Sequence, residues 1–322
     1  MKRFLKCLLT VFLICFIALF LSFYLEKQKF LTQNSKKLKK DTTITLVFAG
    51  DDNYIEPLSV ALTSLNMNTK TPVEAFILTE GFSDKNKFLI RQLDHKLANL
   101  DILIVTIDAK EFEGFPINER WSKSIYFRYL IPNLLPSHKR ALYLDGDILV
   151  LKDLAALFNL PLENNLIAGV SEIGEKNFLS SPLFKNHPFY INSGVLLMDL
   201  EKFRHEKITT QLFQTTEQYK DQFTHYDQDA INLTLKDKIK LLPLKYNAQQ
   251  RISSHFNKII FHYSGKEKPW KLKNHSHHMW YKYQAYKDAL LQEKPFPTEA
   301  YFKSIKDMIF DYSTLGRFFN LN

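Results

Sequence analysis

The sequence predicts an α/β protein with a mostly parallel central sheet and a transmembrane helix at its N-terminus. Short apolar, β-branched runs alternate with segments of helical spacing, an order typical of a parallel sheet with helices on both faces. Polar clusters follow several of these runs, and a long apolar stretch precedes them all. Of the 322 residues, 45% are hydrophobic and 24% are charged, which excludes a mainly disordered or coiled-coil chain.

The apolar stretch Cys7–Leu25 contains no charged residue. As a helix it would span about 28 Å, close to the hydrocarbon thickness of a bilayer. Its end, Phe23 to Leu25, is too bulky for a signal-peptide cleavage site, so we expect residues 1–25 to form a tail and an uncleaved single-pass anchor. More Lys and Arg follow the stretch than precede it, which favours a body in the cytoplasm at a bacterial inner membrane. A body in the Golgi lumen is the alternative.

The Lys-rich residues 26–43 predict a flexible tether between this anchor and the body. Four strands are expected next, because each is an apolar, β-branched run bounded by polar residues. They are Ile44–Ala49, Val73–Leu78, Ile102–Ile107 and Ala141–Leu144. Apolar residues recur at helical spacing between them, and Ser83 is a suitable N-cap. The predicted helices are Leu58–Leu65, Ser83–Leu97 and Ser122–Leu134.

The last part of the chain, residues 271–322, combines lysines with many aromatic residues. It forms either an interfacial segment that docks near a lipid-linked substrate or helices that pack on the core with solvated lysines. The main domain is therefore expected to cover residues 44–270.

The formal net charge of +9 is concentrated at the two ends of the chain. Residues 1–40 hold nine Lys and Arg against one acid, whereas the middle of the chain is acidic. This distribution argues against a nucleic-acid partner and favours an anionic membrane surface. The two cysteines, Cys7 and Cys15, both lie in the apolar stretch, which excludes a disulfide framework and a Cys-based zinc site in the body.

Two carboxylates, Asp145 and Asp147, directly follow the fourth predicted strand. In an extended chain they point to the same side, where they repel each other. A hard divalent cation would relieve this repulsion, and Gly146 leaves space for a ligand to approach. A solvated turn is the alternative, because Asp-Gly is common in turns.

Three further polar clusters follow or precede apolar runs. His262 ends a strand-like run and could complete a Mg²⁺ or Mn²⁺ site with the two aspartates, while Lys268 in the next loop could face phosphate oxygens. Asn192 precedes a buried strand and suits hydroxyl recognition, and Asp227 lies at a predicted helix start. A satisfied polar side chain or a helix cap is the alternative for each.

Five segments together resemble glycosyltransferase family 8, which includes bacterial lipopolysaccharide glucosyl- and galactosyltransferases. They are FAGDDNY (48–54), LYLDGDILV (142–150), INSGVLLMDL (191–200), YDQDAIN (226–232) and HYSGKEKPW (262–270). The resemblance implies a GT-A fold with its catalytic domain at 44–270. It also implies transfer of a hexose from UDP-glucose or UDP-galactose to a glycan or lipid-linked acceptor, with Mn²⁺ or Mg²⁺ as cofactor.

The family's functional residues map onto this sequence motif by motif. The resemblance assigns metal binding to Asp145, Asp147 and His262; donor binding to Ala49, Gly50, Asp51, Asn53, Arg128, Asp145, Gly146, Gly265 and Lys268; and roles at the donor sugar or reaction centre to Asn192, Asp227 and Gln228. Glu172 stands where relatives often carry Asp. The resemblance further implies retention of the anomeric configuration. Front-face attack is favoured because Gln228 is a poor nucleophile, and a covalent intermediate on Asp227 is the alternative.

Two other functions share part of this pattern. A phosphohydrolase of the haloacid dehalogenase type also carries Asp-x-Asp after a strand, but there it follows the first strand, whereas here three strands come before it. A non-catalytic nucleotide-sugar-binding or scaffold protein would keep the fold and lack turnover.

Overall fold

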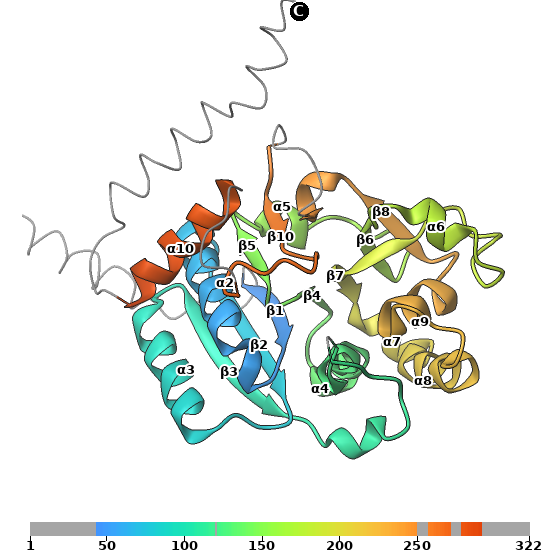
Figure 1. The fold of residues 1–322 in the computed structure, drawn as a ribbon, viewed down its shortest axis with the longest axis horizontal. Coiled ribbons are helices and arrows are strands. Elements are labelled where there is room, and N and C mark those ends of the chain that lie inside the picture. Colours follow the sequence, from blue (N-terminus) through green and yellow to red (C-terminus); the bar gives the residue numbers. More distant parts are fainter. Residues whose placement is uncertain (1–42, 120, 250–256, 272–277, 292–322) are drawn as a thin grey trace, which may run out of the picture. The chain divides into compact units, whose positions relative to one another are not determined.

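A seven-stranded sheet in the order β3-β2-β1-β4-β7-β6-β8 organises the molecule (Figure 1). This computed structural model describes residues 43–119, 121–249, 257–271 and 278–291. The strands of the main sheet are β1 Ile44–Ala49, β2 Val73–Thr79, β3 Leu100–Thr106, β4 Arg140–Leu144, β6 Ile167–Ser171, β7 Ile191–Asp199 and β8 Ile239–Leu242. A three-stranded sheet contains β5 Ile148–Val150, β10 Ile260–His262 and β9 Ala248–Gln249.

Helices cover both faces of the main sheet. The α-helices are α2 Ile55–Asn68, α3 Asp84–Lys96, α4 Ile131–Leu134, α5 Ala155–Phe158, α6 Glu175–Leu179, α7 Leu200–His205, α8 Ile208–Tyr219, α9 Tyr226–Thr234 and α10 His278–Leu291. The 3₁₀ helices are η2 Asp52–Tyr54, η3 Ala109–Phe112, η4 Lys123–Leu130 and η5 Leu244–Tyr246. One core cluster joins alternate residues of β1, β2 and β4 to α2 and α3, and a second joins the opposite residues to η4, α4, α7, α8 and α9.

The expected α/β fold with a mostly parallel sheet is confirmed. Strands β3, β2, β1 and β4 are parallel, as are β6 and β8, but β7 runs antiparallel to both β4 and β6. The amino end of β7 therefore lies beside the carboxyl end of β4, where the Asp145 N–H donates to the Gly194 carbonyl at 2.9 Å. The polar residues that begin β7 consequently meet the carboxylates that follow β4.

The four predicted strands all form, whereas the helix predicted at residues 122–134 differs in type. Most of it is the 3₁₀ helix η4, followed by the single α-helical turn α4 with Pro132 near its start. A 3₁₀ helix also brings residues three apart onto one face, so hydrophobic spacing alone could not distinguish the two. The segment Tyr126–Leu130 is buried, as its apolar character indicates.

The described part of the C-terminal segment packs on the core. Helix α10 contacts α2, and Tyr283 and Met279 are almost fully buried beside Val60 and Phe261. This agrees with the more conservative of the two expectations for residues 271–322. Residues 272–277 and 292–322 lie outside the described part of the chain.

The expectation of a single-pass membrane protein with its catalytic domain in the cytoplasm is corrected. Within residues 43–119, 121–249, 257–271 and 278–291, no helix has the length and apolar character needed to cross a bilayer. The longest helices of this part, α2 and α10, have 14 residues, about 21 Å, whereas a span needs about 30 Å. The stretch that motivated the expectation, residues 7–25, and the predicted tether up to residue 42 lie outside the described residues.

Candidate active site

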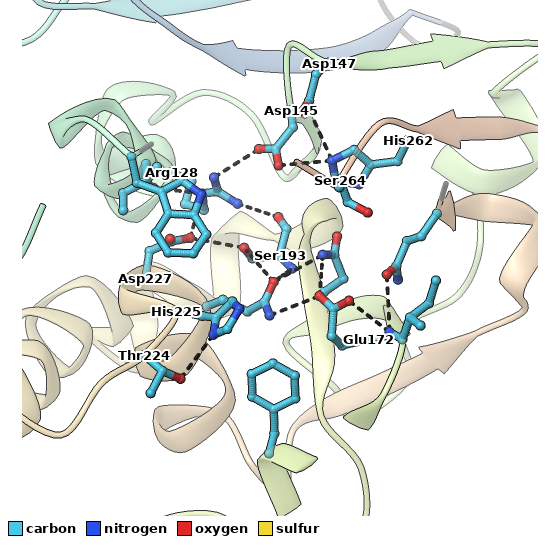
Figure 2. A pocket seen from close by; sticks show the side chains of 18 of the residues that line it. Arg128, Asp145, Asp147, Glu172, Ser193, Thr224, His225, Asp227, His262 and Ser264 are labelled. Atoms are coloured by element: carbon cyan, nitrogen blue, oxygen red, sulfur yellow. Dashed lines mark hydrogen bonds and ion pairs between the residues drawn. The ribbon is translucent and has the colours of Figure 1, made fainter. Parts of the chain in front are cut away.

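A cavity of about 680 Å³ opens at the edge where β4 ends and β7 begins. It is lined by residues from all five of the sequence motifs discussed above, and the first motif contributes Ala49 at the end of β1 and Tyr54. Figure 2 shows the aspartates that follow β4 and His262 of β10 on one side of it, Arg128 and Asp227 on another, and Glu172 opposite them. Segments far apart in sequence thus meet around one space.

The two aspartates and the histidine converge on one point. Asp145, Asp147 and His262 each offer a ligand atom, and these atoms lie within 4.8 Å of one another. The His262 Nε2 is 3.2 Å from Asp147 Oδ1 and 3.6 Å from Asp145 Oδ2. Two carboxylates and one imidazole suit Mn²⁺ or Mg²⁺, and His262 and Asp147 are buried. The residues present therefore fit a divalent cation.

Strand pairing explains why these residues meet. The chain turns at Gly146 from β4 into β5, and β5 pairs antiparallel with β10, with Ile148 opposite His262. The Tyr263 N–H donates to the Asp147 carbonyl at 3.0 Å, which continues the same pairing. His262 is thus brought beside Asp147 by backbone register, although 115 residues separate them in sequence.

Lys268 adds a positively charged side chain to the site. Its Nζ donates to Asp147 Oδ2 at 2.6 Å and to the Tyr263 carbonyl at 2.5 Å. Burial opposes ionisation of Asp147, but the neighbouring Lys268 and His262 outweigh it and hold the pKa of this carboxyl well below its usual value. Asp147 is therefore available as a carboxylate ligand at every physiological pH. Gly265, in the same loop, also lines the cavity.

Arg128 bridges two carboxylates in the wall of the cavity. Its Nη2 lies 3.0 Å from Asp145 Oδ1 and its Nε 3.3 Å from Asp227 Oδ2. Its Nη1 donates to the Ser193 carbonyl at 2.5 Å, and its guanidinium lies 4.3 Å from the centre of the Tyr143 ring. Burial raises the pKa of Asp227 to about 6 despite the opposing effect of Arg128, and the nearby Asp145 adds to this increase.

A cluster of amide side chains also lines the cavity. Asn192 Nδ2 donates to Glu172 Oε2 at 2.7 Å and to Gln228 Oε1 at 3.2 Å. Gln228 Oε1 also accepts from the Ser193 N–H at 2.9 Å, and its Nε2 donates to Glu172 Oε2 at 3.2 Å. Glu172 thus anchors both amides, and the substitution of Glu for the expected Asp preserves an acceptor at this place.

Of the residues predicted to bind the donor at the end of β1 and in the loop after it, only one lines the cavity. Ala49 lines the cavity, together with Tyr54, which the prediction had not singled out. Gly50, Asp51 and Asn53 are not among the lining residues. The Asp51 carboxylate accepts from the Asn53 N–H at 2.9 Å and caps η2.

Sequence reasoning missed several residues of the site. Asn247 bonds His262 and Asn192, and Gly194 leaves the space into which His262 and Asp145 fit. Asn247 lies between η5 and the short strand β9 and carries no recognisable signal, whereas Gly194 could have been noticed as a glycine inside an apolar strand, where close approach is common. The rings of Trp121, Phe178 and His225 also line the cavity.

Comparison with known proteins identifies the family of this chain. The family model described as glycosyl transferase family 8 matches residues 45–274, most of the chain and every strand of the main sheet except the first residue of β1. The chain belongs to glycosyltransferase family 8. The resemblance seen in the sequence motifs is therefore confirmed, and so is the prediction of an enzyme of the hexosyltransferase class. The alternative of a haloacid dehalogenase-type phosphohydrolase is wrong.

Individual relatives match most of the chain. General stress protein A of Bacillus subtilis (strain 168) is 28% identical over 256 residues, 72% of this chain and 89% of that protein. Lipopolysaccharide 1,2-glucosyltransferase of Escherichia coli (strain K12) is 27% identical over 280 residues, 80% of each. The crystal structure of the galactosyltransferase LgtC in complex with donor and acceptor sugar analogs is 25% identical, with a TM-score of 0.68 over 78% of this chain and 98% of that one. This similarity confirms the GT-A type of α/β fold.

Proposed function

We propose that this family 8 enzyme transfers a hexose, with retention of configuration, from UDP-glucose or UDP-galactose to a hydroxyl of a glycan or lipid-linked saccharide. The proposed product is a cell-surface glycan such as lipopolysaccharide. The observation that carries the proposal is the meeting of Asp145, Asp147 and His262 beside Arg128 and Lys268 at one end of a cavity whose middle is lined with amides. Relatives named as lipopolysaccharide glucosyl- and galactosyltransferases support the choice of hexose and acceptor.

The end of the cavity formed by the aspartates and His262 suits the diphosphate of the donor. Asp145, Asp147 and His262 would hold Mn²⁺ or Mg²⁺, which when bound supplies positive charge that stabilises the departing diphosphate. Lys268 adds a point charge from the same wall, and Gly146 and Gly265 let the donor approach the backbone. We assign the nucleoside to the loop after β1, with Ala49 and Tyr54 facing the cavity and Gly50, Asp51 and Asn53 shaping the loop around them.

The middle of the cavity suits the donor sugar. Asn192 and Gln228 are buried, and Glu172 lines the same wall, so these side chains discriminate among sugar hydroxyls by fixed hydrogen bonds. The Oδ2 atom of Asp227 accepts from Ser193 Oγ at 3.1 Å and pairs with Arg128, which makes this oxygen a weaker nucleophile. This supports front-face attack by the acceptor, with the leaving phosphate taking the proton. A covalent sugar adduct on Asp227, trapped from a UDP-sugar, would contradict this route.

The remaining part of the cavity suits the acceptor. The rings of Trp121 and His225 lie 5.4 Å apart, and those of Phe178 and His225 lie 4.8 Å apart. All three are half-buried, so they offer apolar surface to the space they line. Saccharides present apolar faces to aromatic rings, and neighbouring polar side chains such as Gln222 can bind their hydroxyls.

Purified enzyme is expected to release UDP from UDP-glucose or UDP-galactose only when Mn²⁺ or Mg²⁺ is present, because the diphosphate leaves as a highly charged group. Asp147→Asn is expected to reduce this rate about a hundredfold or more. The measurement is UDP release across a panel of UDP-sugars with and without EDTA. Asp108→Asn, at an exposed cap outside the cavity, is the matched control. UDP binding with no metal-dependent release for any sugar would favour a non-catalytic protein.

Trp121→Ala is expected to raise the KM for a saccharide acceptor about tenfold, because an aromatic contact with the acceptor is lost. Hydrolysis of the UDP-sugar without acceptor is expected to stay at the wild-type rate. Initial rates at varied acceptor concentration measure the effect, and Phe88→Ala, at an exposed aromatic residue of α3, is the control. Equal effects on hydrolysis and transfer would place Trp121 at the donor instead.

A further inference from the structure

We propose that Asn247 is a positioning residue that holds His262 in the tautomer with hydrogen on Nδ1, so that the Nε2 lone pair faces Asp145 and Asp147. The inference rests on the proposed function, because it concerns the histidine assigned there to a divalent cation. It assigns a role to a residue outside the recognised motifs. The argument follows a chain of hydrogen bonds that starts at a backbone N–H.

The first step fixes the orientation of the Asn192 amide. Its Oδ1 accepts from the Gly194 N–H at 3.0 Å, and a backbone N–H can only donate. Its Nδ2 donates to Glu172 Oε2 at 2.7 Å, and a carboxylate can only accept. Both neighbours therefore require the same orientation, and the oxygen and nitrogen of Asn192 cannot exchange places.

The second step carries this orientation to Asn247. The Asn247 Nδ2 donates to Asn192 Oδ1 at 2.8 Å, because that oxygen can only accept. The Asn247 oxygen must then be the other end of the amide, and it lies 3.0 Å from His262 Nδ1. An amide oxygen has no hydrogen to give, so the hydrogen of this bond belongs to His262 Nδ1.

Burial makes this bond decisive. Asn247 is 0% exposed and His262 is 3% exposed, so water does not compete for the Nδ1 hydrogen or for the amide. The remaining ring nitrogen, Nε2, points toward Asp147 and Asp145 at 3.2 and 3.6 Å. A histidine can ligate a cation only through a nitrogen that carries no hydrogen, so Asn247 selects the nitrogen that faces the aspartates.

The same chain links the cation site to the middle of the cavity. Asn247 contacts His262 through its oxygen and Asn192 through its nitrogen, and Asn192 in turn contacts Gln228. One side chain thereby fixes the imidazole that faces the cation and the amide proposed to face the sugar. Removing it is expected to loosen both.

The decisive variant is Asn247→Leu, which preserves much of the side-chain volume and removes both bonds. We expect the dissociation constant for Mn²⁺, measured by titration calorimetry in the presence of UDP, to increase about 10- to 100-fold. In ¹⁵N-histidine NMR spectra of the protein with Mg²⁺ and UDP bound, wild-type His262 is expected to show hydrogen on Nδ1. The variant is expected to show a mixture of tautomers.

Two other variants separate this role from general packing. Asn68→Leu removes a half-buried amide that bonds Ser64, Val150 and Tyr286 outside the cavity, and it is expected to leave Mn²⁺ affinity unchanged. Asn247→Asp keeps an acceptor for His262 Nδ1 and is expected to retain Mn²⁺ binding, while turnover falls because the contact to Asn192 is altered. This split between affinity and turnover is not expected from a purely structural residue.

Each outcome bears on the proposal. Wild-type Mn²⁺ affinity in a folded Asn247→Leu, or hydrogen on Nε2 in wild-type His262, would overturn it while leaving the proposed function standing. Loss of Mn²⁺ binding in Asn247→Asp equal to that in Asn247→Leu would overturn it as well. Wild-type protein that binds no Mn²⁺ with UDP would overturn the proposed function first. If Asn247→Leu does not fold, the wild-type spectrum and Asn247→Asp still test the tautomer.

Discussion

Replacing Gly194 by alanine is expected to lower metal-dependent sugar transfer about a thousandfold. A Cβ at this position would lie 2.3 Å from His262 Cε1 and 2.6 Å from Asp145 Oδ2, closer than real Cβ contacts occur. The imidazole and the carboxylate would both have to move, and both belong to the proposed cation site. Loss of a bound cation's contribution of several kcal/mol corresponds to about this change in rate.

The control for this variant is Gly169→Ala, in the neighbouring strand β6. Its Cβ would also be crowded, at 2.6 Å from Ile191 Cδ1, but that atom is the end of an aliphatic side chain that can move. We expect Gly169→Ala to cost about 1–3 kcal/mol of unfolding free energy and to keep Mn²⁺ affinity. Calorimetry with Mn²⁺ and UDP and denaturant unfolding measure the two effects. Gly194→Ala with wild-type Mn²⁺ affinity would show that the site is not built as described.

Arg128→Met is expected to lower the unfolding free energy of the metal-free protein by about 3–5 kcal/mol. Arg128 is 4% exposed, and its guanidinium pairs with Asp145 and Asp227. Methionine fills similar space but leaves the buried Asp227 carboxylate without its partner, and an unpaired buried charge carries a cost of this size. Burial alone would lower the pKa of Arg128, but Asp227, Tyr143 and Asp145 outweigh it and raise this pKa.

A second substitution tests this explanation of the Arg128 effect. In the double variant Arg128→Met with Asp227→Asn, the unpaired charge is gone, so part of the lost stability is expected to return. Urea unfolding of the wild type, both single variants and the double variant at neutral pH gives the coupling between the two residues. Purely additive effects would mean that Arg128 stabilises the fold through packing and its bonds to carbonyl groups.

Much of the fold was accessible from local sequence patterns. Strand β1 has the predicted bounds, because a run of apolar residues buried on both faces of a parallel sheet leaves little ambiguity. The pairing of Asp145 and Asp147 with His262 was also expected, from residue chemistry and from the family resemblance. The first feature depends on the composition of one short segment, and the second on residue types at the positions of recognisable motifs.

Other features depend on tertiary structure and could not be predicted. The direction of β7 is set by its antiparallel pairing with β4 and β6. Because of this direction, the amino end of β7, which carries Asn192, lies at the cavity. The role of Asn247 depends on two hydrogen-bonding neighbours, Asn192 of β7 and His262 of β10, neither of which is visible in its own sequence neighbourhood. The cap that Asp51 forms on η2 is a local contact that short polar residues form readily, and no sequence motif distinguished it from a binding role.

Anomalous X-ray scattering from crystals grown with Mn²⁺ and UDP tests the central claim most directly. The account predicts one manganese peak within about 2.5 Å of an oxygen of Asp145, an oxygen of Asp147 and Nε2 of His262. The diphosphate of UDP is expected on the open side of the same ion. A peak elsewhere in the cavity, or a bound UDP diphosphate held by Arg128 and Lys268 with no manganese between the aspartates, would contradict it.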